Sequence, residues 1–282
     1  MEHVTKAQVK FVRSLQLKKN RDESGLFVAE GEKCVEELRK GFQLELLVVS
    51  SEKLVVSTEY RVVSGEKVVV ATREEIERMS GLETPQGVVG VFKKQDGKPT
   101  GRPEAYRRED ASLQDLVVAL DGVQNPGNLG TIIRTCDWFG VKRIVCSPDT
   151  ADCYNPKVVQ ATMGALTRVR VEYMELPKWL ETYQGKVYGT LLDGKNLYER
   201  LKDGKPTGRP EAYGREDASL QDGQRPTGVI VFGNEGKGIS EEVRKYISEP
   251  IRIPSYPEGA ETSESLNVAI AAAIVLAEFR RA

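Results

Sequence analysis

Histidine is almost absent from this sequence, and its scarcity excludes several classes of enzyme. Of the 282 residues only His3 is a histidine, and it lies near a terminus, where chains are commonly mobile. Histidine is the commonest general acid or base and the commonest metal ligand. Serine-hydrolase triads and H-E-x-x-H metal sites are therefore excluded, and no metal is expected.

Cysteine is scarce as well. Cys34, Cys136, Cys146 and Cys153 show no C-x-x-C spacing. This pattern predicts reduced, buried thiols rather than disulfides or zinc ligands.

Long apolar runs are also missing. No stretch reaches the length of roughly eighteen residues that a membrane helix needs, and the charged N-terminal segment contains no apolar core of a secretory signal. We therefore expect a cytoplasmic protein without a membrane span.

The chain has no marked excess of either charge. Its 41 Lys and Arg residues nearly balance 42 Asp and Glu, which leaves a net charge of -1. Binding to a phosphate backbone would therefore need a local basic patch. The first twenty-one residues offer a candidate, although a solvated amphipathic helix fits equally well; the patch comprises Lys6, Lys10, Arg13, Lys18, Lys19 and Arg21.

A polar segment occurs twice. Residues 96–115, DGKPTGRPEAYRREDASLQD, recur as residues 203–222 with only Arg107 replaced by Gly214. Structural repeats follow one another in tandem and carry an apolar face for stacking, which these copies lack. We interpret them as a duplicated insertion in surface loops, although both copies carry Lys and Arg and an RNA contact is the alternative.

The remaining sequence predicts an α/β protein of two domains. Residues 1–95 contain a basic helix, an acidic helix around GEKCVEELRKG and strands such as LELLVVS, EKVVVAT and GVVGVFK. From residue 116 to 282, the apolar runs LVVAL, RIVCS, KVYGTLLD, GVIVFG and PIRIPS alternate with helical stretches. This alternation is typical of a buried parallel sheet covered on both faces.

The first polar motif, DGVQNPGNLGTIIRTCDWFGV, follows the strand LVVAL directly. Asn128 is a candidate cap for a helix that carries a buried stripe and ends at Gly140. Arg134 falls on a different face from Ile133 and Cys136, so it can point toward the strand ends where open α/β sheets bind ligands. A solvated helix arginine is the plain alternative.

The second motif, GVIVFGNEGKGIS, runs from a strand into a glycine-dense loop, and Ser240 is the expected cap of the helix SEEVRKYI. The Walker pattern fails because Gly238 follows Lys237 where a hydroxyl residue is required. No G-x-G-x-x-G occurs, so a dinucleotide-binding unit is not supported. The glycines still indicate a close approach of the backbone to a ligand or to another segment.

The third motif, IRIPSYPEGAETSESLNVAIAAAIVLAEFRR, contains an Ala-rich helix able to pack closely on several sides. Ser265 and Asn267 precede it and would place a hydroxyl and an amide beside the preceding loop.

Together, NPGNLGTIIRTCDWFG, FGNEGKGIS and SESLNVAIAAAIVLAEF resemble, in this order, the three motifs of the SpoU (TrmH) family of RNA ribose 2′-O-methyltransferases, within the SPOUT superfamily. The resemblance spans residue 116 to the end apart from the second insert. LFVAEGEKCVEEL and LETPQGVVGVF are similar to that family's N-terminal substrate-binding domain. The resemblance implies a substrate-binding domain at 1–95, an inserted linker at 96–115, and at 116–282 a trefoil-knotted methyltransferase domain that contains the insert 203–222.

The resemblance also implies roles for individual residues. The cofactor would be S-adenosylmethionine (SAM), the partner an rRNA or tRNA, and the assembly a homodimer. The backbone amides from Gly233 to Gly236 could receive the cofactor. The implied catalytic residues are Asn128, Arg134, Glu235, Ser265 and Asn267, and the implied cofactor-binding residues are Leu192, Gly233, Ile253 and Leu266.

Methyl transfer from SAM needs chiefly a well-placed nucleophilic oxygen. An arginine is a poor base because its pKa exceeds ~12, so Arg134 is expected to orient the hydroxyl and a neighbouring phosphate. The alternatives are a non-catalytic RNA-binding protein of the same fold, a base methyltransferase and a nucleotide-dependent kinase or GTPase.

Overall fold

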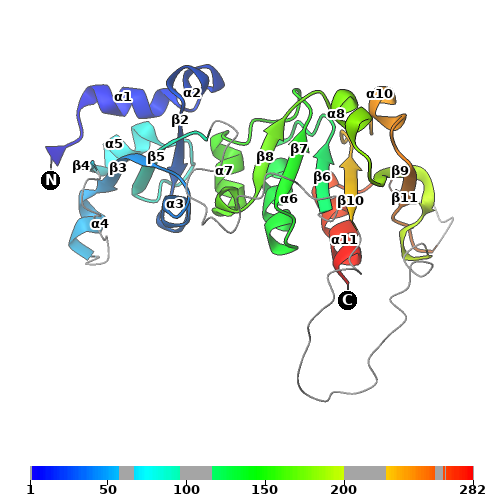
Figure 1. Cartoon of the computed structure of the whole chain (residues 1–282). Helices are drawn as coiled ribbons and strands as arrows, with labels where there is room; N and C mark the ends of the chain where they lie inside the picture. Colours follow the sequence, from blue (N-terminus) through cyan, green and yellow to red (C-terminus); the bar gives the residue numbers. More distant parts are fainter. Residues whose placement is uncertain are drawn as a thin grey trace, which may run out of the picture. The chain divides into compact units, whose positions relative to one another are not determined.

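The computed structural model describes residues 2–56, 67–95, 116–199, 227–257, 263 and 265–281 (Figure 1). Both copies of the duplicated segment, 96–115 and 203–222, lie outside the described residues. The chain divides into two compact units that do not follow chain order. The first comprises residues 1–109, 124–137 and 151–171, and the second comprises residues 110–123, 138–150 and 172–282.

The first unit is built on a mixed sheet. Its strand order is β1 (Glu2–His3), β4 (Val68–Ala71), β3 (Leu44–Ser50), β5 (Val88–Lys93) and β2 (Leu26–Glu30). β5 runs antiparallel to both of its neighbours, whereas β1, β4 and β3 are parallel.

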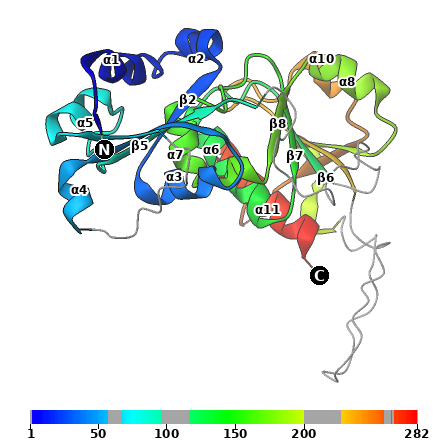
Figure 2. The same ribbon diagram turned by 60° about the vertical axis from the view of Figure 1, so that its left-hand side comes forward.

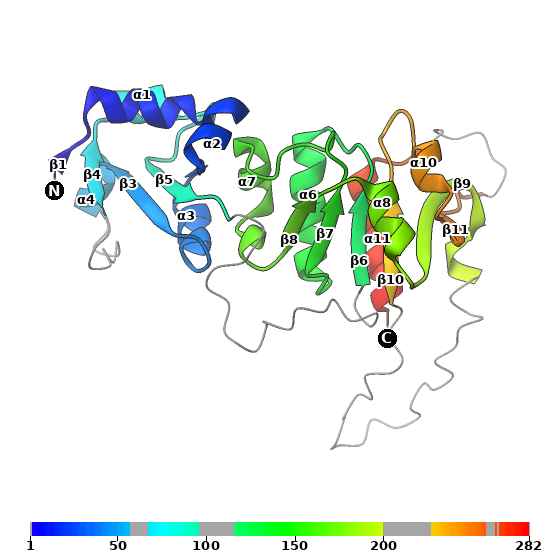
Figure 3. The same cartoon turned by 45° about the horizontal axis from the view of Figure 1, so that its top comes forward.

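Two capped helices cover one face of this sheet. α1 (Lys6–Ser14) and α5 (Arg73–Met79) each begin after a threonine that forms a capping box, Thr5 and Thr72. Val12 of α1 and Ile76 of α5 share a core with alternate residues of the strands. Figure 3 shows α1 on this side of the strands, with α3 (Glu32–Arg39) on the opposite side.

The opposite face is packed largely with aromatic rings. Phe27 of β2 lies with its ring centre 5.1 Å from Phe42, 5.6 Å from Phe92 and 4.8 Å from Tyr154. Ring pairs at such separations stabilise a core beyond the area that they bury. Tyr154 thereby attaches the stretch 151–171, which contains α7 (Pro156–Thr162) and the 3₁₀ helix η2 (Ala165–Thr167), to the first unit.

The remaining short helices of the first unit are α2 (Lys18–Ser24), which ends at Gly25 with φ 67°, and α4 (Ser51–Val56). Figure 2 shows α2 beside α1. Arg21 of α2 is only 1% exposed, so it does not belong to the predicted basic surface. Lys18 pairs with Asp22 and Lys19 with Glu23. Local ion pairs thus neutralise part of the predicted patch.

The second sheet has the order β11 (Glu249–Arg252), β9 (Val187–Asn196), β10 (Gly228–Phe232), β6 (Leu116–Leu120), β7 (Arg143–Cys146) and β8 (Arg170–Tyr173). From β11 to β7, each neighbouring pair is parallel. The central strands are buried along their whole length, as expected for a parallel sheet covered on both faces.

Helices of the second unit cover both faces of this sheet. α8 (Leu176–Thr182) and α10 (Glu241–Arg244) pack against alternate residues of β6, β9 and β10. α11 (Val268–Arg280) packs on the other face, where Phe279 meets Tyr188 of β9 edge to face at 4.9 Å.

The predicted α/β architecture with a parallel sheet in the C-terminal part is confirmed. The runs LELLVVS and LVVAL match β3 and β6 residue for residue. β2 and β8 were not among the predicted strands. The four cysteines are buried, as predicted. Within the described ranges, no helix is long and apolar enough to cross a bilayer.

Candidate functional site

The helix of the first motif begins two residues earlier than the expected cap. α6 (Pro126–Trp138) is capped by Asn125, whose Oδ1 accepts hydrogen bonds from the backbone N of Gly127 at 2.8 Å and of Asn128 at 3.3 Å. Proline suits the first helical position because its missing N–H would have no partner there. The prediction that Asn128 caps the helix is therefore wrong, and Asn128 lies in the first turn.

The two candidate residues of α6 are accessible. Asn128 is half-buried and Arg134 is exposed, whereas Ile132, Ile133 and Cys136 are buried. The predicted separation of Arg134 from the apolar stripe is confirmed. The burial of Cys136, next in sequence to Asp137, raises the pKa of its thiol.

The second motif forms a tight turn that is held by Asn234. Asn234 and Gly238 exchange backbone hydrogen bonds of 2.9 Å in both directions. The side chain of Asn234 accepts from the backbone N of Gly236 and of Lys237, and it donates to the carbonyl of Gly122 at 2.7 Å. The amides of Asn234 and Gly236 are thus hydrogen-bonded inside the turn. That the backbone around Gly233 to Gly236 receives the cofactor stays a prediction.

Gly233 permits the closure of this turn. A Cβ at Gly233 would stand 2.2 Å from the carbonyl carbon of Gly238 and 2.4 Å from the nitrogen of Ile239. No side chain fits there without moving backbone. Glu235 and Lys237, at the tip of the turn, are exposed.

The carboxylate of Asp121 ties the turn to the end of β6. Its Oδ2 accepts a hydrogen bond of 2.7 Å from the backbone N of Ser240. Ser240 occupies the predicted N-cap position of α10, but its side chain makes no capping bond, and the helix ends at Arg244. The sequence reasoning missed both Asp121 and Asn234, although polar residues directly after parallel strands are a recognised signal.

The third motif leads into α11. Asn267 is its N-cap, and its side chain accepts from the backbone N of Ala269 at 3.0 Å and of Ile270 at 3.3 Å. Ser265 and Leu266 precede the cap and are exposed, Leu266 to 49%.

The candidate cofactor residues of the second unit follow neighbouring strands. Gly233 comes directly after β10 and Ile253 directly after β11. In β9, Gly189 pairs with Pro250 of β11, and Lys195 pairs with the next residue of β11, Ile251. Residues 190–194 of β9 therefore form an excursion from the ladder, an enlarged β-bulge. Leu192 lies in this excursion and is 74% exposed. Because β11, β9 and β10 are parallel neighbours, their carboxyl ends share one edge of the sheet, where such folds bind ligands.

These positions fit a cofactor with apolar and polar parts. Leu192 and Leu266 present exposed aliphatic side chains, whereas the space beside Gly233 is filled by the backbone of Gly238 and Ile239. The described part of the chain contains no cluster of three or more His, Cys, Asp or Glu side chains arranged for a metal ion. The structure thus places Leu192, Gly233, Glu235, Ile253, Ser265, Leu266 and Asn267 in the second unit, and Asn128 and Arg134 in the first.

Comparison with known proteins gives two family matches. Residues 115–277 match the model described as the SpoU rRNA Methylase family. Residues 6–90 match the model described as the MRM3-like substrate binding domain.

Similar individual proteins cover nearly the whole chain. The 23S rRNA (guanosine(2553)-2′-O)-methyltransferase RlmP of Bacillus subtilis is 28% identical, over 99% of this chain and 98% of its own. A solved structure from Porphyromonas gingivalis, assigned to the TrmH family of RNA methyltransferases, is 34% identical with a TM-score of 0.74 over 99% of this chain and 98% of its own. The AdoMet-bound rRNA methyltransferase of Sinorhizobium meliloti is 28% identical with a TM-score of 0.72, over 100% of this chain and 97% of its own.

The family model covers more than half of the chain, and it includes the first two motifs that carried the resemblance and all but the last two residues of the third. The protein therefore belongs to the SpoU rRNA methylase family and is a SAM-dependent methyltransferase.

Proposed function

We propose that this protein transfers the methyl group of SAM to a ribose 2′-hydroxyl of RNA, with ribosomal RNA as the preferred substrate over tRNA. The observation that carries the proposal is the match of residues 115–277 to the SpoU methylase family, within which Arg134 is exposed on α6. The activity printed for the relative from Bacillus subtilis supports the choice of the 2′-oxygen and of rRNA.

SAM would be held at the carboxyl edge of β9, β10 and β11 by Leu192, Gly233, Ile253 and Leu266. The exposed aliphatic side chains of Leu192 and Leu266 would cover its apolar parts, and the closed turn that begins at Gly233 would form one wall of the site. When bound, SAM supplies a methyl group that its sulfonium already makes electrophilic. No metal is required for this chemistry.

Arg134 would orient the 2′-hydroxyl and an adjacent phosphate. Its guanidinium stays protonated and offers several donors in a fixed plane, which suits a phosphate. Asn128, two turns earlier on α6, would bind the same part of the RNA. Glu235 would bind a substrate group, and Ser265 would contribute a hydroxyl.

Asn267 has a role that the structure supports directly. As the N-cap of α11 it holds the start of that helix, and a cap of this kind contributes about 1 kcal/mol to stability. We propose that this cap also sets the position of Ser265 and Leu266, two and one residues before it.

The larger organisation follows from the same family membership. Residues 1–95 would bind RNA, residues 116–282 would form a trefoil-knotted catalytic domain, and the protein would act as a homodimer. Closed two-fold symmetry is the commonest arrangement of soluble oligomers. Light scattering at micromolar concentration should give a dimer mass, and a monomer mass would refute that part of the proposal.

The role of Arg134 can be tested by substitution. Arg134→Ala should lower kcat at least ~100-fold, because the 2′-hydroxyl would no longer be oriented and a misplacement of about 1 Å can cost ~100-fold. SAM affinity, measured by calorimetry, should stay unchanged. Lys178→Ala is the control, since Lys178 is an exposed cation on α8, outside the residues assigned to RNA binding. Near-normal turnover by Arg134→Ala would contradict the assignment.

A further inference from the structure

Arg168 joins two helices of the first unit. Its Nε donates to both carboxylate oxygens of Asp137 at 2.9 Å, and its Nη2 donates to Oδ2 of Asp137 at 2.8 Å. Its Nη1 donates to Oε2 of Glu37 at 3.3 Å. Asp137 lies in the last turn of α6, and Glu37 lies in α3. The guanidinium of Arg168 thus connects α6, which carries Asn128 and Arg134, with α3, which packs on the N-terminal sheet.

The contact between Arg168 and Asp137 has a defined orientation. A planar guanidinium that binds a carboxylate through two nitrogens fixes orientation as well as distance. Bonding to Asp137, and secondarily to Glu37, raises the pKa of Arg168, so its charge persists at all working pH values. The side chain of Arg168 is 47% exposed, and exposed ion pairs contribute little to overall stability. The contribution to overall stability is therefore small, and the role of the pair lies in the orientation that it favours for α6.

Both ends of this connection rest on tightly packed backbone. On α6, a Cβ at Gly130 would stand 2.5 Å from Cβ of Ala161, so α6 and α7 are in close contact. A Cβ at Gly164, next to η2, would stand 2.3 Å from Cβ of Glu37, so this turn lies directly on α3. Lys40 also bonds to Glu37 from one turn further along α3. These contacts join α6 to α7 and the turn at Gly164 to α3, and Arg168 adds a direct link between α6 and α3.

We propose that Arg168 is a positioning residue, which holds α6 at a set angle to α3 and so fixes Asn128 and Arg134 relative to RNA bound by the N-terminal domain. This inference rests on the proposed function, because it assigns the bound RNA to residues 6–90 and the reacting hydroxyl to Arg134. Loss of Arg168 should misplace the reacting groups without disturbing the cofactor residues, which lie in the second unit.

The test compares Arg168→Ala, Arg168→Lys and Glu37→Gln in the full-length protein. Arg168→Ala should lower kcat by on the order of 10-fold, below the ~100-fold that a misplacement of about 1 Å can cost, while KM for RNA and the affinity for SAM change less than about twofold. Arg168→Lys keeps one donor toward Asp137 and should recover part of the loss. Glu37→Gln keeps the bonds to Asp137 but weakens the contact with α3, and should lower kcat by less than Arg168→Ala because the amide oxygen can still accept a hydrogen bond.

Two further readouts separate positioning from simple loss of stability. Melting temperatures should be similar for all of these variants, whereas amide hydrogen exchange at the C-terminal turn of α6 should be faster in Arg168→Ala. In a double-mutant cycle, Asp137→Ala should add little to Arg168→Ala, because the two residues form one interaction. An equal drop in kcat and in SAM affinity, or additive effects of the two substitutions, would overturn the proposal.

The outcomes also distinguish this inference from the proposed function. A wild-type protein that methylates RNA, together with a fully active Arg168→Ala variant, would refute the positioning role alone. A wild-type protein without transferase activity would refute the proposed function, and the exchange measurement would still report whether Arg168 holds α6.

Discussion

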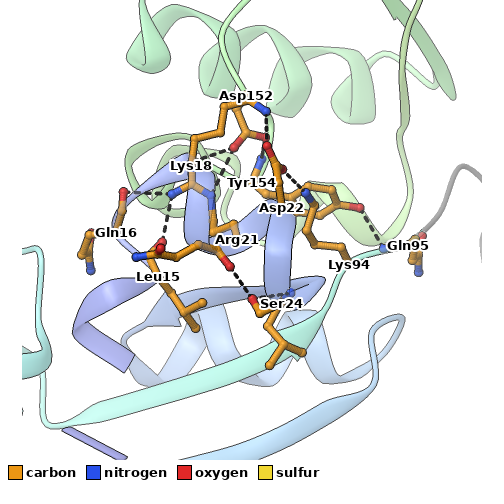
Figure 4. A network of polar contacts seen from close by, with 12 residues as sticks. Leu15, Gln16, Lys18, Arg21, Asp22, Ser24, Lys94, Gln95, Asp152 and Tyr154 are labelled. Atoms are coloured by element: carbon orange, nitrogen blue, oxygen red, sulfur yellow. Dashed lines mark hydrogen bonds and ion pairs between the residues drawn. The ribbon is translucent and has the colours of Figure 1, made fainter. Parts of the chain in front are cut away.

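At the scale of single residues, Arg21 shows that a charge in a basic stretch of sequence can be buried and paired by the tertiary structure. It belongs to a basic stretch of sequence, yet it is fully buried, and its Nη1 donates to the carbonyls of Leu15 and Gln16 at 2.9 Å each (Figure 4). Its Nε and Nη2 donate to Oδ2 of Asp152 at 3.1 and 2.6 Å. The partner lies 131 residues further along the chain, so no local pattern could predict this ion pair.

Replacement of Arg21 should destabilise the protein strongly. Arg21→Met leaves Asp152 buried beside an apolar group, and breaking a buried pair in this way costs about 3–5 kcal/mol of unfolding free energy. Urea unfolding measures the loss. The double variant Arg21→Met with Asp152→Asn should lose less than the single variant, because it removes the unpaired charge. A single variant as stable as the wild type would show that the pair is not needed.

Asp22 should make stability depend on pH. Hydrogen bonds from Lys18 and then from Lys94 lower the pKa of its carboxyl from 3.8 to about 2. Because the folded pKa lies below the unfolded one, this stabilisation is complete above about pH 4. It is lost as the pH falls toward 2. The stability difference between wild type and Asp22→Asn, from urea unfolding, should be larger at pH 6 than at pH 3, and a constant difference would contradict this account.

At the scale of elements, the turn from Gly233 to Gly238 provides a pair of matched glycines. Gly233→Ala drives a Cβ to 2.2 Å from backbone, whereas Gly236→Ala places one 3.6 Å from the nearest atom, Oδ1 of Asn234, which is ordinary contact. Overpacking of this kind costs about 1–3 kcal/mol of folding stability and is relieved by moving backbone. If the turn shapes the cofactor site, that movement should also weaken binding, and a loss of about 1.4 kcal/mol of binding free energy is a factor of ten in affinity.

Calorimetry should therefore show SAM binding weakened ~10-fold or more by Gly233→Ala and nearly unchanged for Gly236→Ala. Circular dichroism serves as the control for folding. Equal affinities of the two variants would mean that the closed turn does not shape the cofactor site.

The helices and strands also show which features of the fold could be predicted from sequence patterns. Buried strands such as β6 could be predicted because continuous aliphatic runs have few other uses in a chain of this length. The start of α6 was misplaced because Asn125 and Asn128 both suit a cap, and Pro126 between them was the decisive signal. The role of Asn234 was not predictable, since its bonds to Gly122 and to its own turn depend on how β6 and β10 pair.

At the scale of the whole molecule, the α/β architecture was predictable from the alternation of strands and helices, and the family from three motifs in order. Which stretches of the chain make up each compact unit was not predictable from the sequence. Residues 151–171 pack with the first unit through Asp152, Tyr154 and Arg168, and each of these contacts pairs residues more than a hundred positions apart. Such contacts arise from the topology of the chain, not from local periodicity.

The measurement that tests the central claim most directly is methyl transfer to natural RNA. The purified protein is incubated with methyl-labelled SAM and total RNA from cells lacking its gene, and rRNA and tRNA are then separated. Label confined to rRNA, at one linkage that resists alkaline cleavage, is the predicted result because a 2′-O-methyl group blocks attack by the ribose oxygen. The absence of label from all RNA despite measurable SAM binding, or label on a base atom, would contradict the proposed function.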